Sequence, residues 1–355
     1  MSVQIAVTDV VHRYHPGGPP ALDGASLTAT RGEMLTILGP SGSGKSTLLS
    51  IIAGLEQPDS GTVSFDGRDV TATPPQDRAV GLVLQGASLF PHLSVAGNVA
   101  FGIAARGVAA ADRERVAAQW LSRVGLDGMG DRRARQLSGG QAQRVALIRA
   151  LAIEPEVLLL DEPLANLDEQ VRRELQHVLR DLVARTGVTG IMVTHDVAEA
   201  MSMGSSTALL VDGSVIAQDA PERIFRRPAT RRVAEFVGIS TFITGSARDG
   251  AIETACGPLP VSTGLPTSGP VTIAIRPEHV RLAGRHDSAR PGDAVIPGTA
   301  GTPVFRGTHW DCPVDTPLGP ITARSDAQPP DPGDACQLLM SGADLFPVED
   351  DAARG

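Results

Sequence analysis

The sequence predicts an α/β domain with a mostly parallel sheet, followed by a small all-β domain. Residues 1–240 alternate short apolar strands with helical segments, the pattern of a parallel sheet covered by helices. Residues 241–355 hold 15 of the 27 prolines and short apolar stretches between glycines and prolines, as short β-strands do. A length of 355 residues fits two domains with sizeable cores.

A glycine-rich loop joins a strand to a helix near the N-terminus. Residues 33–38 predict the strand, and residues 47–53 predict a helix that ends at Gly54. Glycines in such a loop let backbone N–H groups converge on an anion, and the helix N-terminus adds its dipole. The chain's only lysine can reach between phosphates here, and the serine after it can hold Mg²⁺. The candidate nucleotide-binding residues are Gly39, Pro40, Ser41, Gly42, Ser43, Gly44, Lys45, Ser46 and Thr47.

Two further apolar strands end in polar side chains. Residues 157–160 precede Asp161 and Glu162, and residues 191–194 precede His195. Since α/β sheets bind ligands at the carboxyl ends of their strands, we expect Asp161 to bind Mg²⁺ and Glu162 to orient the attacking water. His195 can contact a γ-phosphate and steady the water; the alternative is a structural histidine.

The region between the loop and the second strand is predicted to be a helical insertion, about residues 87–155. Apolar residues recur on one face at 116, 120, 121 and 124. Ser138, Gly139 and Gly140 precede a helix predicted for residues 141–152, so they offer a second helix N-terminus to phosphate. A helix cap followed by a flexible turn is the alternative. Residues 169–185 predict an amphipathic helix that ends at Gly187.

The bulk composition excludes several classes of function. A net charge of −9 and a pI near 5.4 argue against nonspecific nucleic-acid binding. The first fifteen residues lack the pattern of a signal peptide, and the apolar runs are far shorter than a bilayer span, so we expect any membrane association to require a partner. Three cysteines without metal-site spacing are expected to be isolated thiols.

Together these segments resemble the nucleotide-binding subunits of ABC transporters. Residues 39–47 resemble the Walker A motif, residues 137–141 the signature, residues 157–162 Walker B and residues 164–168 the D-loop. The resemblance implies ATP and Mg²⁺ as cofactors and a head-to-tail pair of subunits, in which the signature of one copy completes the ATP site of the other. The residues concerned are Leu137, Ser138, Gly139, Gly140 and Gln141 in the signature and Asp168 in the D-loop. Gln85 resembles the Q-loop glutamine beside Mg²⁺ and the attacking water, His195 the switch histidine, and Tyr14 the aromatic residue that stacks on adenine.

A subgroup of the family is also indicated. Residues 88–98, 68–71 and 74–75 resemble ATPases of bacterial importers for iron, polyamines, sulfate and sugars, and Ile275-Arg-Pro-Glu-His279 resembles a hallmark of the small β-barrel TOBE domain. The resemblance implies transmembrane permease subunits, an extracytoplasmic solute-binding protein as an indirect partner, and a place on the cytoplasmic face of the inner membrane. Ferric iron and polyamine rank equally as solutes, ahead of sulfate, sugar or phosphonate. Arg276 and Glu278 can equally form a solvated surface pair.

Three alternatives remain at this point. A soluble ABC ATPase of DNA repair or translation usually carries a long coiled coil or two tandem ATPase halves. A nucleotide-dependent regulatory module without turnover would not need Glu162. A P-loop kinase would lack the signature-like residues 137–141.

Overall fold

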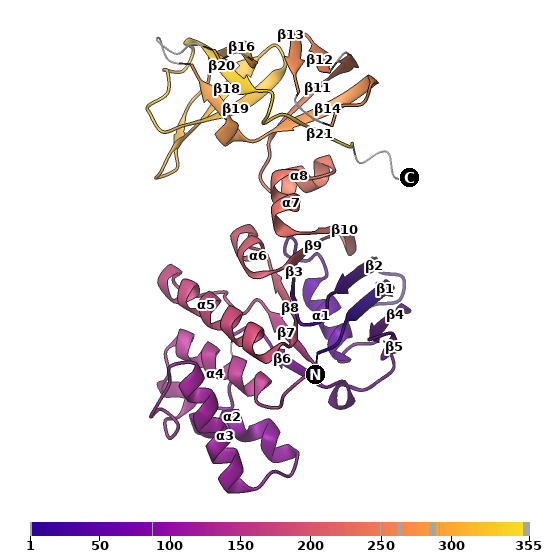
Figure 1. The fold of residues 1–355 in the computed structure, drawn as a ribbon, viewed down its shortest axis with the longest axis vertical. Helices are drawn as coiled ribbons and strands as arrows, with labels where there is room; N and C mark the ends of the chain where they lie inside the picture. The colour runs from indigo at the N-terminus through magenta and orange to yellow at the C-terminus, as the bar shows by residue number, and fades with distance from the viewer. Residues whose placement is uncertain are drawn as a thin grey trace. The chain divides into compact units, whose positions relative to one another are not determined.

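The computed structural model describes residues 2–86, 88–248, 250–261, 264–283, 289–290 and 292–350. Residue 87, where the predicted helical insertion begins, and residues 351–355 lie outside these ranges. The chain divides into two compact units, residues 1–221 and 222–355, so the predicted boundary at residue 240 lies inside the second unit (Figure 1). Within the described residues, no helix has both the length and the apolar character needed to span a bilayer.

A six-stranded sheet forms the centre of the first unit. Its strand order is β10-β9-β3-β8-β7-β6, and every neighbouring pair is parallel except β9 with β10. The strands are β3 (Met34–Leu38), β6 (Val80–Val83), β7 (Val157–Asp161), β8 (Thr189–Thr194), β9 (Ser206–Val211) and β10 (Ser214–Asp219).

Both faces of this sheet are buried. In β7, Val157 and Leu159 belong to one hydrophobic core, while Leu158 and Leu160 belong to the other. Adjacent side chains of a strand point to opposite faces, so a continuous apolar run requires cover on both sides. This is why the predicted strands read as uninterrupted apolar runs.

One face packs on α1 (Lys45–Ala53) and a four-stranded antiparallel sheet in the order β2-β1-β4-β5. Figure 1 shows this sheet on one side of the unit and helices α2 to α5 on the other. Its strands are β1 (Ile5–His12), β2 (Leu22–Ala29), β4 (Ser60–Phe65) and β5 (Arg68–Asp69).

The other face packs on helices. Leu175, Leu179 and Leu182 of α5 (Glu169–Thr186) are buried at helical spacing, and Gly187 ends the helix in a left-handed conformation. The predicted amphipathic helix is therefore confirmed. The remaining helices are α2 (Val95–Ala105), α3 (Ala110–Arg123), α4 (Gly139–Leu151) and α6 (Val197–Met203), with short 3-10 turns at Pro75–Asp77 and Ala134–Gln136.

The second unit consists of two antiparallel sheets around one core, as the all-β prediction requires. One has the order β13-β12-β11-β14-β21, with β11 (Thr241–Arg248), β12 (Ala251–Thr254), β13 (Gly257–Pro260), β14 (Ser268–Ile275) and β21 (Phe346–Val348). The other has the order β15-β20-β16-β18-β17, with β19 paired to β18; it contains β15 (Val280–Leu282), β16 (Asp293–Ala300), β17 (Val304–Phe305), β18 (Trp310–Thr316), β19 (Gly319–Ser325) and β20 (Ala335–Ser341). A 3-10 turn covers Pro277–His279, and the three cysteines are free thiols.

Two short helices belong to the second unit because a buried arginine joins them to the strands. Arg276 donates to the carbonyl oxygens of Phe225 in α7 (Pro221–Arg226) and of Val237, the residue that ends α8 (Arg231–Phe236). Its guanidinium also lies over the ring of Phe225. Arg276 is thus a structural connection and not part of a solvated surface pair.

A second buried arginine supports the end of α1. Arg78 is 1% exposed and donates to the carbonyl oxygens of Ile51 and Ile52, in the last turn of α1, and of Thr71 and Thr73. The last carbonyl groups of a helix lack partners within the helix, and a cation at that end also favours the helix dipole. Arg78 therefore supplies hydrogen-bond donors to carbonyl groups at the C-terminal end of the helix that begins at Lys45.

We expect Arg78→Met to lower the free energy of unfolding by about 3 kcal/mol, because it removes a buried side chain that donates to four carbonyl groups, two of them in fully buried contacts. The measurement is urea unfolding of the full chain, monitored by circular dichroism. Arg31→Met is the control: Arg31 forms an exposed ion pair with Asp66, and its loss is expected to cost less than about 1 kcal/mol. Equal losses in the two variants would contradict this role for Arg78.

Candidate functional site

The parallel register brings three separate segments to one edge of the sheet. Leu38 at the end of β3 lies opposite Thr194 at the end of β8, and Asp161 at the end of β7 lies opposite Val193. The residues that follow these strands are the phosphate-binding loop, Glu162 and His195. Ligands bind at such carboxyl edges of parallel sheets.

The phosphate-binding loop leads directly into α1. Gly44 precedes the helix with a φ of 99°. Only glycine fits here, because a Cβ would lie 2.3 Å from the carbonyl oxygen of Ala21. Lys45 is buried, and its Nζ donates to the carbonyl oxygens of Gly39 (2.9 Å) and Pro40 (2.8 Å). An ammonium has three donors, so one remains for a ligand.

A serine and an aspartate meet beside this loop. Ser46 Oγ donates to Asp161 Oδ1 at 3.1 Å. Burial raises the pKa of the Asp161 carboxyl, whereas the hydrogen bond from Ser46 opposes that shift. Burial likewise lowers the pKa of Lys45, against the opposing charges of Glu162 and Asp161. A hydroxyl and a partly buried carboxylate are oxygen ligands that fit Mg²⁺.

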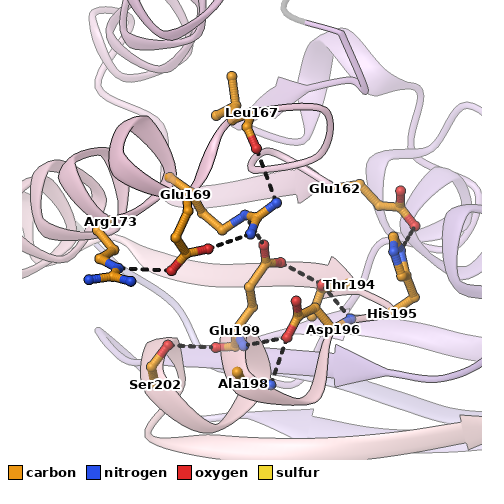
Figure 2. Close-up of polar contacts among 11 residues, drawn as sticks. Glu162, Leu167, Glu169, Arg173, Thr194, His195, Asp196, Ala198, Glu199 and Ser202 are labelled. Atoms are coloured by element: carbon orange, nitrogen blue, oxygen red, sulfur yellow. Dashed lines mark hydrogen bonds and ion pairs between the residues drawn. The ribbon is translucent and has the colours of Figure 1, made fainter. Parts of the chain in front are cut away.

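Both oxygens of the Glu162 carboxylate are held by side chains from other segments. Gln85 Nε2 donates to Glu162 Oε2 at 3.0 Å. Figure 2 shows the contact at the other oxygen, where His195 Nδ1 lies 3.0 Å from Glu162 Oε1. Glu162 has a φ of 43°, the left-handed region that side chains other than glycine rarely adopt. Such backbone strain concentrates at functional sites. The structure thus brings Gln85, Glu162 and His195 together, and Asp161 and Ser46 lie beside them.

A cavity of about 210 Å³ adjoins this carboxylate. It is formed by the end of β8, the start of α6 and the loop between β7 and α5. Its lining residues are Gln85, Glu162, Leu164, Ala165, Asn166, Arg172, Thr194, His195, Asp196 and Glu199.

Tyr14 lies near the start of α1. The residue is 57% exposed, and its hydroxyl forms a hydrogen bond of 2.9 Å with Thr47 Oγ1. The rings of His12 and Tyr14 stand nearly perpendicular, with their centroids 4.9 Å apart. The exposed part of the tyrosine ring, held by its hydroxyl, is available for stacking.

The segment 137–141 begins α4. The helix starts at Gly139, two residues earlier than the sequence predicted, because Ser138 is its N-cap: Ser138 Oγ accepts from Gln141 N, and Gln141 Oε1 accepts from Ser138 N. A Cβ on Gly140 would lie 2.4 Å from Cγ1 of Val171, so α4 packs closely on α5 there. Among the described residues, no hydrogen bond joins this segment to the phosphate-binding loop of the same chain.

Asp168 caps α5 by accepting from Val171 N at 3.0 Å. Sequence reasoning missed two charged residues near this helix start, Arg172 and Glu199. The sequence around Glu199 is misleading: an acid three residues after the cap Asp196 is typical of a capping box, in which its carboxylate would accept from the backbone N–H of the cap residue. Its carboxylate instead accepts from Thr194 Oγ1 at 2.6 Å.

The comparisons with known proteins match both units. The model of the family described as "ABC transporter" matches residues 22–165, and that of the TOBE domain matches residues 273–347. The Fe(3+) ions import ATP-binding protein of Streptomyces coelicolor is 41% identical over 82% of this chain and 82% of its own length. This chain belongs to the ABC transporter family.

Other relatives of this ABC ATPase are comparably similar. A sulfate/thiosulfate import ATP-binding protein of Chromobacterium violaceum is 45% identical over 79% of this chain and 76% of its own. A spermidine/putrescine import ATP-binding protein of Ruegeria pomeroyi is 40% identical over 81% of this chain and 82% of its own length. A solved dimeric ATP-binding cassette in a post-hydrolysis state, bound to ADP and Pi, is 32% identical, with a TM-score of 0.55 over 61% of this chain and 98% of that chain. The predicted fold and the ATP-hydrolysing activity are thereby confirmed.

We expect Gly44→Ala to lower the free energy of unfolding of this ABC ATPase by about 3 kcal/mol, because the added Cβ meets a backbone oxygen at a positive φ. Gly42→Ala is the matched control. Gly42 also has a positive φ, 81°, but its Cβ would meet nothing within 4 Å, so the expected loss is about 1 kcal/mol. Urea unfolding measures the loss in both variants. Equal losses would show that the positive φ, and not the clash of the added Cβ with Ala21, sets the cost of the substitution.

Proposed function

We propose that this chain is the ATP-hydrolysing subunit of an ABC import complex. The observation that carries the proposal is the Glu162 carboxylate, held at one oxygen by Gln85 and at the other by His195, at the sheet edge that also presents Lys45. A carboxylate fixed in this way can orient a water molecule toward a phosphate. The names of the relatives support a role in import.

The binding part of the site is built to hold a nucleoside triphosphate. The backbone N–H groups of residues 41–47 would surround the phosphates, and the ammonium of Lys45 would neutralise their charge. Tyr14 offers its exposed face to adenine. Ser46, Asp161 and the amide oxygen of Gln85 are the residues that would hold Mg²⁺, which when bound draws electron density from the phosphate oxygens.

Hydrolysis then depends on three side chains. Glu162 accepts a hydrogen bond from the attacking water and aligns it with the γ-phosphate. His195 fixes the carboxylate from one side and reaches the γ-phosphate, while Gln85 fixes it from the other side. Because the two partners come from the ends of different strands, the geometry depends on the sheet register.

The signature acts in a second copy of the chain under this proposal. Ser138 and the N–H groups of Gly139 and Gly140 lie at a helix N-terminus, which attracts phosphate. No hydrogen bond in the described residues connects them to the phosphate-binding loop of their own chain, and the solved relative bound to ADP and Pi is dimeric. Two copies arranged head to tail would enclose ATP between them.

Transmembrane permease subunits are the proposed partners on the helical side. A groove of about 710 Å³ runs between α2 and α3, and Phe101, 48% exposed, lies in its lining. Most of the lining is apolar or small, including Ala96, Gly97, Ala100 and Ala104. A helix of a permease subunit fits such a groove, and this contact would place the chain on the cytoplasmic face of the membrane, with an extracytoplasmic solute-binding protein as an indirect partner.

The solute belongs to the class that these relatives transport: ferric iron, a polyamine or sulfate. The identities of 41, 45 and 40% do not separate the three. The alternative of a soluble ABC ATPase in DNA repair or translation is disfavoured, because α3, with 14 residues, is the longest helix described between the phosphate-binding loop and the signature.

We expect Glu162→Gln to bind ATP with wild-type affinity, to accumulate a closed dimer and to lose about a thousandfold in kcat, since an amide is a far weaker base than a carboxylate. Nucleotide binding, size-exclusion chromatography with ATP and steady-state ATPase assays measure these three properties. Lys45→Ala is the contrasting variant and should lose nucleotide binding itself. Wild-type turnover in Glu162→Gln would refute the role of Glu162 as base.

The head-to-tail arrangement predicts a complementation result. Chains with Ser138→Arg and chains with Lys45→Ala should each be inactive alone. When mixed, they should recover up to about a quarter of wild-type activity, because half of randomly formed dimers are mixed and each mixed dimer holds one intact site. An inactive mixture would show that the signature serves its own chain.

A further inference from the structure

A buried carboxylate lies directly behind the proposed switch histidine. The side chain of Glu199, in the first turn of α6, is 8% exposed. Its Oε2 accepts a hydrogen bond of 2.6 Å from the Thr194 hydroxyl. The hydroxyl oxygen, Thr194 Oγ1, in turn accepts a hydrogen bond of 3.0 Å from the backbone N–H of Asp196 (Figure 2). These two bonds involve the residues immediately before and after His195.

The other oxygen of the Glu199 carboxylate faces an arginine from a different element. Arg172 Nε of α5 lies 3.5 Å from Glu199 Oε1. The same guanidinium donates to the carbonyl oxygen of Leu167 at 3.1 Å and to Glu169 Oε2 at 2.8 Å. Leu167 immediately precedes Asp168, the cap of α5 and the last residue of the D-loop.

Burial alone would not favour an ionised carboxylate at this position. It raises the pKa of Glu199, and the neighbouring Asp196 acts in the same direction, whereas the Thr194 hydroxyl, Arg172 and His195 oppose the shift. An ionised group in such a place needs a partner, because removing one member of a buried pair leaves the other uncompensated. The Arg172 guanidinium supplies that partner.

The chain of contacts therefore runs from the D-loop backbone to the backbone on both sides of His195. It passes through Arg172, Glu199 and Thr194. All three residues also line the 210 Å³ cavity beside Glu162. Among the described residues, no hydrogen bond or ion pair joins any of these three side chains to Glu162. Their effect on the site would pass through His195, which lies 3.0 Å from Glu162 Oε1.

We propose that Glu199 and Arg172 are positioning residues that hold His195 against Glu162 by tying residues 194–196 to the backbone of Leu167. This inference rests on the proposed role of His195 in ATP hydrolysis. A displacement of the D-loop end would pass to His195 through this tie, because chains of packed, ion-paired and hydrogen-bonded side chains transmit motion between elements.

The test uses the full chain under conditions in which it dimerises. Glu199→Ala should lower kcat about tenfold while leaving the KM for ATP and nucleotide affinity at wild-type values, because it misplaces a group that acts after ATP has bound. Glu199→Gln should recover part of the loss, since its amide oxygen still accepts from Thr194. Glu174→Ala is the matched control: Glu174 pairs with Arg144 across α4 and α5 at 2.9 Å and touches neither segment, so its kcat should be unchanged.

A double-mutant cycle separates positioning from a general structural role. In the His195→Ala background, single-turnover assays with radiolabelled ATP should show no further loss from Glu199→Ala, because the group it positions is absent. Equal losses in both backgrounds, a raised KM for ATP, or an unchanged kcat in Glu199→Ala would each overturn the inference and leave the proposed function intact. Wild-type turnover in His195→Ala would overturn the role of His195 itself. If Glu199→Ala fails to fold, Arg172→Met carries the same cycle.

Discussion

The parallel pairing of β8 with β3 on one side and β7 on the other is the constraint on which the site depends. Each of these strands has apolar side chains on both faces, and each face is covered by its own core. A register slip of one residue would exchange side chains between the two cores, where their sizes and shapes no longer match their neighbours, and is therefore disfavoured. The same register fixes where the strands end, and so where the phosphate-binding loop, Glu162 and His195 meet.

Around this edge, buried charges are held by specific polar partners. Lys45 donates to two carbonyl groups of its own loop, and Glu199 faces Arg172 of another helix. Farther from the site, Arg78 and Arg276 act similarly by donating to carbonyl groups at helix ends. Such contacts add little net stability, but leaving either partner alone is costly. They therefore favour one arrangement of the loops over others.

Much of the fold could be predicted from the sequence because the signals were local. The strands at β3, β7 and β8, the helix predicted for residues 47–53 and the amphipathic α5 follow from apolar periodicity and from glycines at helix ends; the first of these helices in fact begins at Lys45. The prediction was less good where local signals compete. The helix α4 begins at Gly139 because the Ser138 cap outweighs the poor helix propensity of two glycines. Arg276 is buried, whereas the sequence left a solvated surface pair with Glu278 as an equal alternative.

The sequence by itself determined the chemistry that this protein can offer: an ammonium and a hydroxyl after a glycine loop, carboxylates after one apolar strand and a histidine after another. Residue types and their spacing along the chain are enough for that. Only the tertiary structure decided that Gln85 and His195 hold the two oxygens of Glu162, and that Glu199 faces Arg172 behind the histidine. Those contacts join residues between 27 and 77 positions apart, and the packing of sheets and helices, not any local pattern, brings such residues within hydrogen-bond distance.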